Sequence, residues 1–109
     1  MKFNKKQLRR NMREATKNEL GVLWPDVREY MEAENRKMIE SLKMIHELRK
    51  LNRIDLEMAQ ALIQGQKEAR TTLLLSIDGL KVIMIERTLN AALDSIRESV
   101  NTVLDFELL

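Results

Sequence analysis

Hydrophobic residues recur at helical intervals along much of this chain. Within positions 25–51 they are separated mostly by three, four or seven residues, at Val27, Met31, Met38, Leu42, Ile45 and Leu48. A second stripe with the same period runs from Val82 to Val103. Residues three and four apart share one face of an α-helix, so amphipathic helices are predicted over 25–51 and 86–106.

Polar and conformationally special residues indicate where a first helix begins and ends. Leu8, Met12 and Ala15, with Glu19 continuing the row, share one face of a predicted helix over 4–20. Asn4 is placed to cap this helix, and Gly21 to end it. The helix that follows has Pro25 in its first turn, where the missing N–H of proline is not needed.

A tight connection separates the second helix from a third. Asn52 can take the left-handed conformation after a helix, and Asp55 can cap the next one. The third helix is predicted to start at Leu56 and to run at least to Arg70. Short connections favour antiparallel neighbours, so the pattern predicts an all-α bundle of three to four helices.

Residues 71–86 support two interpretations. Two β-rich runs separated by Asp78 and Gly79 have the form of a β-hairpin, which would make the fold α+β. Leu73, Ile77, Leu80 and Met84 also form a helical stripe. Because an isolated two-stranded hairpin is marginal in water, a continuous or kinked helix is the favoured interpretation.

Composition narrows the class of protein. The 109 residues are 44% hydrophobic and 33% charged, which is too apolar for disorder and too charged for a membrane span. This length predicts one domain, divided into a basic N-terminal helix or arm at 1–20 and a helical bundle at 22–109. With no cysteine in the chain, we expect a cytoplasmic protein.

The residues that carry most enzymatic chemistry are scarce. The chain has no Cys and one His, and its three glycines are too scattered to cradle a phosphate. His46 cannot belong to a Glu-x-x-His metal motif, because Lys43 occupies the position of the Glu. We therefore expect no catalytic, cofactor-binding or metal-binding residues, and a protein that is not an enzyme.

Positive charge is concentrated at the N-terminal end. Residues 1–20 hold seven basic and two acidic residues, a net charge of +5, which leaves −3 for the other 89. Four of the basic residues share the polar face of the first helix, and they are the candidate nucleic-acid contacts: Lys6, Arg10, Arg13 and Lys17. The competing interpretations are a solvated or partner-facing surface and contact with an anionic membrane surface.

The apolar stripes of long helices favour self-association, because two or three thin helices cover little of their own surface. The candidate interface residues are Trp24, Met31, Met38, Ile45, Leu80, Met84 and Phe106. Glu34 lies on an apolar stripe, where we expect it to pair across an interface with Arg49 or Arg70, or to fix register. The leading hypothesis is a homo-oligomeric interaction or scaffolding protein that contacts itself and another protein. The alternative is a small nucleic-acid-binding or regulatory protein.

Overall fold

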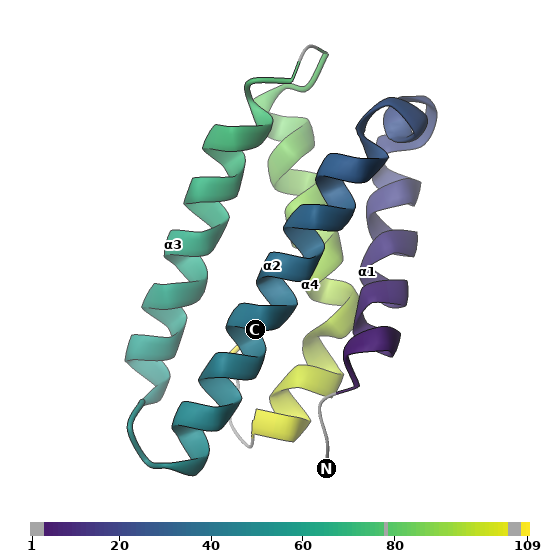
Figure 1. Ribbon diagram of the computed structural model, residues 1–109. Helices are drawn as coiled ribbons and strands as arrows, with labels where there is room; N and C mark the ends of the chain where they lie inside the picture. Colours follow the sequence, from purple (N-terminus) through teal and green to yellow (C-terminus); the bar gives the residue numbers. More distant parts are fainter. Residues whose placement is uncertain (1–3, 78, 105–107) are drawn as a thin grey trace.

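The chain forms an antiparallel bundle of four long helices (Figure 1). The computed structural model describes residues 4–77, 79–104 and 108–109. The helices are α1 (Lys5–Leu20), α2 (Trp24–Lys50), α3 (Leu56–Leu74) and α4 (Val82–Leu104), with a short 3₁₀ turn η1 (Gly21–Leu23) after α1. In this bundle α2 and α4 lie between α1 and α3, and α1 packs most extensively against α4. The predicted all-α bundle is confirmed.

The local signals for helix ends are also confirmed. The side-chain oxygen of Asn4 accepts a hydrogen bond from the backbone N–H of Gln7 at 3.1 Å. At the start of α3, Asp55 accepts one from the N–H of Met58 at 2.8 Å. Gly21 has φ 54° and Asn52 has φ 56°. Both residues therefore have the positive φ typical of helix ends, although the ψ of −120° at Gly21 differs from that of the left-handed helical conformation.

The segment 71–86 forms neither a β-hairpin nor a continuous helix. α3 continues to Leu74, and α4 begins at Val82. Between them the N–H of Ile77 donates to the carbonyl of Leu74 at 3.1 Å, and that of Leu80 to Ile77 at 3.2 Å. Gly79 follows at φ 89°, which breaks the helix. Gly79 therefore marked a turn correctly, whereas Asp78 lies outside the described residues, and the turn joins two helices and not two strands.

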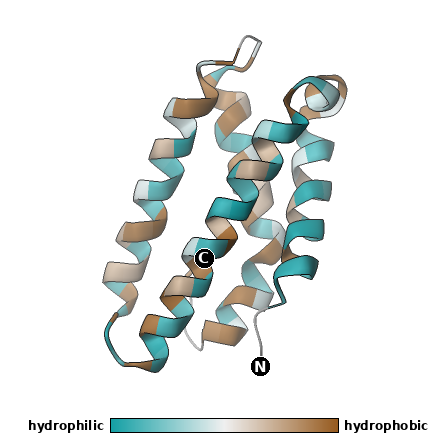
Figure 2. Ribbon diagram, in the orientation of Figure 1, coloured by the Kyte–Doolittle hydropathy of each residue, from teal (hydrophilic) through white to brown (hydrophobic). Residues whose placement is uncertain are grey.

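The core explains why helices form on both sides of this turn. Leu74, Leu80 and Ile85 are buried together at one end of the bundle, against side chains of α1 and α2. Figure 2 shows hydrophobic residues along the facing sides of the helices. The two hydrophobic clusters are made of Leu20, Trp24, Val27, Met31, Leu74, Leu80, Ile85 and Leu89 at this end, and of Leu8, Met12, Met38, Ile39, Leu42, Ile45, Ile54, Ala59, Ile63, Ala92, Leu93, Ile96, Val100, Leu104 and Leu108 along the rest.

The inner face of α1 differs from the predicted row. Its buried residues are Leu8, Met12, Thr16 and Leu20, whereas Ala15 is half-buried and Glu19 is exposed. A row at every fourth residue drifts slowly around the helix, so it follows a neighbouring helix that crosses at an angle. Thr16 is accommodated because its hydroxyl donates to the carbonyl of Met12 at 2.9 Å within α1.

Most of the candidate interface residues lie in the core of the single chain. Trp24, Met31, Met38, Ile45 and Leu80 are at most 8% exposed. Four helices cover one another's stripes, and α1 is one of these four, so the segment expected as an arm is part of the bundle.

Two interface candidates remain outside this group. Met84 is half-buried, and Phe106 lies outside the described residues. Over the part of the chain that the structure describes, none of the helices is long and apolar enough to span a membrane.

Candidate anion-binding groove between the first two helices

Two ion pairs show which residues of the antiparallel helices α1 and α2 lie at the same level. Lys5 Nζ lies 2.7 Å from Glu40 Oε1, and an Arg13 guanidinium nitrogen lies 3.9 Å from Glu32 Oε1. The two pairs are separated by eight residues on each helix, which is about two turns. The residues midway between them are Arg9 on α1 and Arg36 on α2. This register therefore puts two arginines at the level where a third ion pair would otherwise lie.

The acidic residues that flank this level are already engaged. The ammonium of Lys5 donates a hydrogen bond to Glu40, which raises the pKa of Lys5 and lowers the pKa of Glu40. Glu32 accepts a hydrogen bond from Arg28 Nε at 3.3 Å in addition to its contact with Arg13. Each carboxylate therefore has a closer cationic partner than the arginines between them, although Arg9 also helps to lower the pKa of Glu40.

A hollow opens in the surface at the level of Arg9 and Arg36. It has a volume of about 290 Å³ and is lined by Lys6, Arg9, Arg10, Arg13, Glu32, Asn35 and Arg36. Five of these residues are cationic and one is anionic, a net charge of +4. A second hollow of about 820 Å³ shares Arg9 and Arg36 with the first and extends across α2 to Lys37 and to Gln66 of α3. We call the two hollows together the basic groove.

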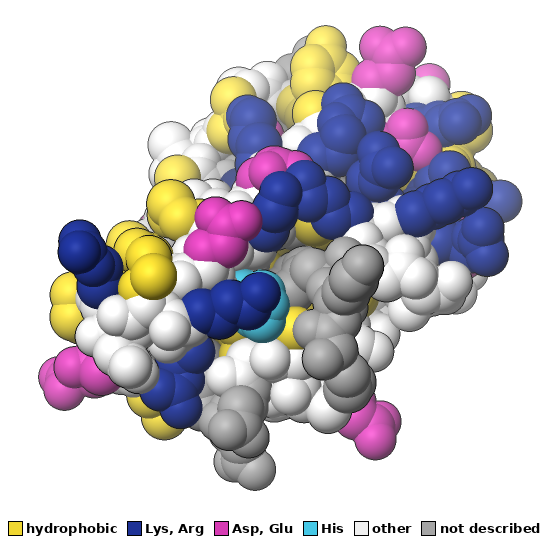
Figure 3. Space-filling model, turned by 60° about the horizontal axis from the view of Figure 1, so that its bottom comes forward, with side chains coloured by type: hydrophobic (Ala, Val, Ile, Leu, Met, Phe, Trp, Pro, Cys, Tyr) yellow, Lys and Arg dark blue, Asp and Glu magenta, His cyan; other side chains and the backbone are white. Residues whose placement is uncertain are grey.

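Cations on this side of the molecule are mostly free of partners. Among the described residues, Lys6, Arg9, Arg10 and Arg36 form no ion pair and are exposed. Figure 3 shows basic side chains crowded on the side of the molecule that carries α1. Like charges held close together raise the local potential and attract anions.

One buried donor lies beneath these cations. Asn35 lines the first hollow, is only 3% exposed, and its side-chain nitrogen has no hydrogen-bond partner. A buried polar group without a partner destabilises a fold by about 1–3 kcal/mol. The arrangement combines guanidinium groups and a buried amide with an unpaired N–H donor in the lining of one concave site, which is suited to an oxyanion.

The sequence analysis found part of this groove. Of the four candidate nucleic-acid contacts, Lys6, Arg10 and Arg13 line the first hollow, whereas Lys17 lies outside it on the next turn of α1. Arg9, Asn35 and Arg36 were not singled out. Arg9 was detectable because it lies three residues after Lys6 on the same helical face. The contributions of Asn35 and Arg36 depend on how α2 packs against α1.

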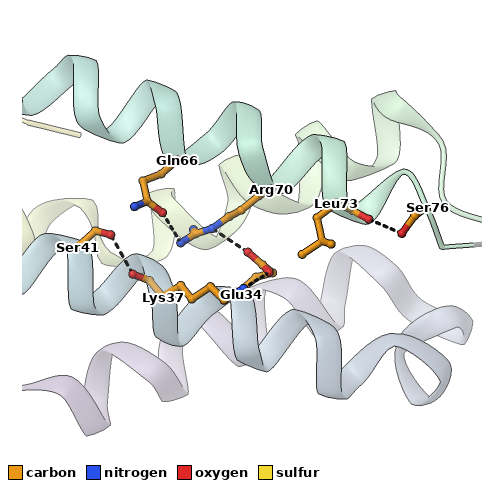
Figure 4. Close-up of polar contacts among 7 residues, drawn as sticks. All are labelled: Glu34, Lys37, Ser41, Gln66, Arg70, Leu73 and Ser76. Atoms are coloured by element: carbon orange, nitrogen blue, oxygen red, sulfur yellow. Dashed lines mark hydrogen bonds and ion pairs between the residues drawn. The ribbon is translucent and has the colours of Figure 1, made fainter.

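A different arrangement of charge lies on the opposite side of α2. Glu34 and Arg70 are both about 4% exposed, and Arg70 Nε lies 3.1 Å from Glu34 Oε2 (Figure 4). Gln66 accepts a hydrogen bond from the Arg70 guanidinium at 3.2 Å, and Lys37 donates one to Glu34 at 3.1 Å. Of the two partners that the sequence offered for Glu34 across an interface, the structure shows Arg70. This pair joins α2 to α3 within one chain.

Burial affects the acid–base behaviour of two residues outside the groove. It lowers the pKa of Arg70, although the ion pair with Glu34 opposes this effect. Burial also lowers the pKa of His46, with a further contribution from Lys50. His, Asp and Glu side chains do not gather in threes anywhere among the described residues, so no group there could hold a metal ion.

Comparisons with known proteins identify no relative. Neither the protein-family models, nor the curated proteins, nor the solved structures contain a match to this chain.

Proposed function

We propose that this protein is a small, non-enzymatic nucleic-acid-binding protein that contacts phosphate groups through the basic groove. The observation that carries the proposal is that Arg9 and Arg36 lie at one level of the α1–α2 register, form no ion pair in the described part of the protein, and line a hollow with a net charge of +4. Phosphate backbones attract such clusters, because binding releases the counterions that surround a nucleic acid.

The shape and charge of the groove support backbone contacts over the reading of base sequence. Its cations come from two helices, α1 and α2, and most of them are exposed. Arginine and lysine contacts to phosphate position a protein on nucleic acid without specifying its sequence. We therefore expect binding that varies little with sequence and weakens steeply with salt.

A charge-matched pair of variants tests the proposal. The first variant changes Lys6, Arg10, Arg13 and Lys17 to Ala, and the second changes Lys50, Arg53, Lys81 and Arg87 to Ala. Both lower the formal net charge from +2 to −2, and all eight side chains are exposed. Binding of a labelled short DNA duplex is measured by fluorescence anisotropy at several salt concentrations.

The two variants are expected to behave differently. The first should lose most of its affinity, and the slope of log affinity against log salt should fall by about one for each phosphate contact removed. The second should retain most of the affinity of the natural protein. Equal losses in both variants would mean that net charge alone attracts DNA, and the groove would have no role.

A second candidate function is self-association through the outer face of α3. Met58, Leu62 and Leu73 are 55%, 43% and 49% exposed, and Gly65 and Ala69 are exposed between them. From Met58 to Ala69 the spacing is four, three and four residues, which is the spacing of a coiled-coil seam. A second copy of this chain supplies a helix with the same seam, so the face fits an antiparallel α3–α3 contact.

Light scattering on a sizing column tests this second candidate. We expect the molar mass of a dimer, and a monomer for Leu62→Glu, because the charge would lie in the centre of the contact. Gln64→Glu introduces the same carboxylate on another exposed part of α3 and should remain dimeric. If the natural protein elutes as a monomer at high concentration, self-association through α3 is excluded. This result would not affect the proposal that the basic groove binds nucleic acid.

A further inference from the structure

The first hollow of the basic groove has features that a general attraction for nucleic acid does not require. Backbone contacts need exposed cations, yet this hollow also has the buried amide of Asn35 among its lining. The amide nitrogen has no partner within the described part of the protein. An unpaired buried donor is unfavourable by itself, so its place beneath four unpaired cations indicates a ligand atom that reaches inside.

We infer that this hollow is a subsite for one terminal phosphate group, a phosphate monoester. The inference rests on the proposed function, since it takes a nucleic-acid end as the carrier of the phosphate. Arg9 and Arg36 would bind its oxygens from the rim, and Asn35 would donate to the oxygen that lies deepest.

Geometry favours a monoester over the phosphodiester of the backbone. A phosphodiester has substituents on two of its oxygens, so it can present only two free oxygens to the protein. A monoester has three free oxygens and can enter a hollow of about 290 Å³ with its single substituent pointing outward. It also carries nearly two negative charges at pH 7, which matches the net charge of +4 better than the single charge of a diester.

The hydrophobic packing of α1 against α2 forms the subsite before a ligand arrives, and two exposed ion pairs flank it. Lys5–Glu40 and Arg13–Glu32 tie α1 to α2 on either side of the Arg9–Arg36 level. Binding would therefore require no movement of the two helices, only reorientation of exposed guanidinium groups. A site that is already formed loses less free energy to ordering when its ligand binds.

The test compares two single-stranded oligonucleotides of identical sequence, one with a 5′-phosphate and one with a 5′-hydroxyl. The natural protein is expected to bind the phosphorylated form at least about tenfold more tightly, the scale of one hydrogen bond to a charged group. This preference should grow as the pH rises through about 6, where the monoester loses its second proton.

Two variants connect the preference to the hollow. Asn35→Leu keeps the size and charge of the site but removes the buried donor, so it should abolish the preference and leave affinity for the 5′-hydroxyl form unchanged. Arg9→Gln alters an exposed residue that cannot affect folding strongly, and it should reduce the preference as well. Lys17→Gln is the control, because Lys17 lies outside the hollow and should weaken both oligonucleotides by the same factor.

Each outcome has a definite meaning. Equal affinity for both forms, or a preference that survives in Asn35→Leu, would overturn the subsite, while salt-dependent binding of both forms would keep the proposed function. If neither oligonucleotide binds, the proposed function fails, and inorganic phosphate then decides the subsite. Phosphate-dependent shifts of the Asn35 side-chain NMR signals would support a site for free phosphate, and their absence would overturn the inference.

Discussion

The two sides of α2 use arginine in different ways. On the side of α1, Arg9 and Arg36 are exposed, lie at one level and form no ion pair among the described residues. On the side of α3, Arg70 is buried and paired with Glu34 at 3.1 Å. Glu34 and Arg36 are only two residues apart on α2, so the direction in which each side chain points decides its environment.

This difference separates arginines that stabilise the folded protein from arginines that are available to bind a ligand. Removing a buried ion from its partner leaves a charge in a medium of low polarity, which strongly destabilises a protein. Removing an exposed cation changes stability little, because water already solvates it. The two arginine environments should therefore respond oppositely in assays of stability and of binding.

The largest effect is expected from Arg70→Met. Glu34 would remain buried without its main partner, which typically costs about 3–5 kcal/mol, and the exposed Lys37 at 3.1 Å should keep the loss near the lower figure. Urea denaturation measures the free energy of unfolding. The double variant Glu34→Leu/Arg70→Met should recover most of the loss. A single variant as stable as the natural protein would mean that the pair does not hold α2 to α3.

Gly65→Ala should have a smaller effect of opposite sign. An added Cβ would have no atom within 4 Å, and alanine is favoured over glycine inside a helix by about 1 kcal/mol, so the chain should become more stable. If a second copy packs closely against Gly65, dimerisation should weaken at the same time. Denaturation and light scattering on one sample measure both changes, and a tighter dimer would contradict the proposed contact.

Arg36→Gln sharpens the contrast with Arg70. We expect a change of no more than about 0.5 kcal/mol in the free energy of unfolding, because the side chain is exposed and unpaired. Relief of repulsion from Arg9 should make any change a gain. DNA affinity should nevertheless fall, as anisotropy would show. A marked loss of stability would place Arg36 among the residues that hold the fold.

The smallest effect concerns pH. Because burial lowers the pKa of His46 below its ordinary value of 6.5, the unfolded chain binds more protons than the folded chain between the two pKa values. The free energy of unfolding should therefore fall as pH drops below about 6.5, and level off below the folded pKa. Comparing the free energy of unfolding of the natural protein and of His46→Gln across this pH range isolates the contribution of His46. If the two curves of free energy against pH run parallel, His46 makes no such contribution.

The sequence determined the helices and most of their ends. The apolar period of α2 and α4, the caps at Asn4 and Asp55, and the positive-φ residues Gly21 and Asn52 act over a few residues, so they were predictable directly. The turn near Gly79 was also visible. The hairpin stayed open as an alternative to the favoured helix because hydrophobic β-branched runs fit a buried strand and a buried helix end equally well.

Only the tertiary structure decided which charges stay in water and which are buried. The basic row of α1 was readable from spacing, but Arg36 and Asn35 join it through the antiparallel register with α2. The same packing buried the apolar helix stripes that had suggested self-association, and it left the face of α3 around Leu62 exposed. Periodicity fixes which residues share a helical face, whereas contact between residues far apart in the chain fixes what that face meets.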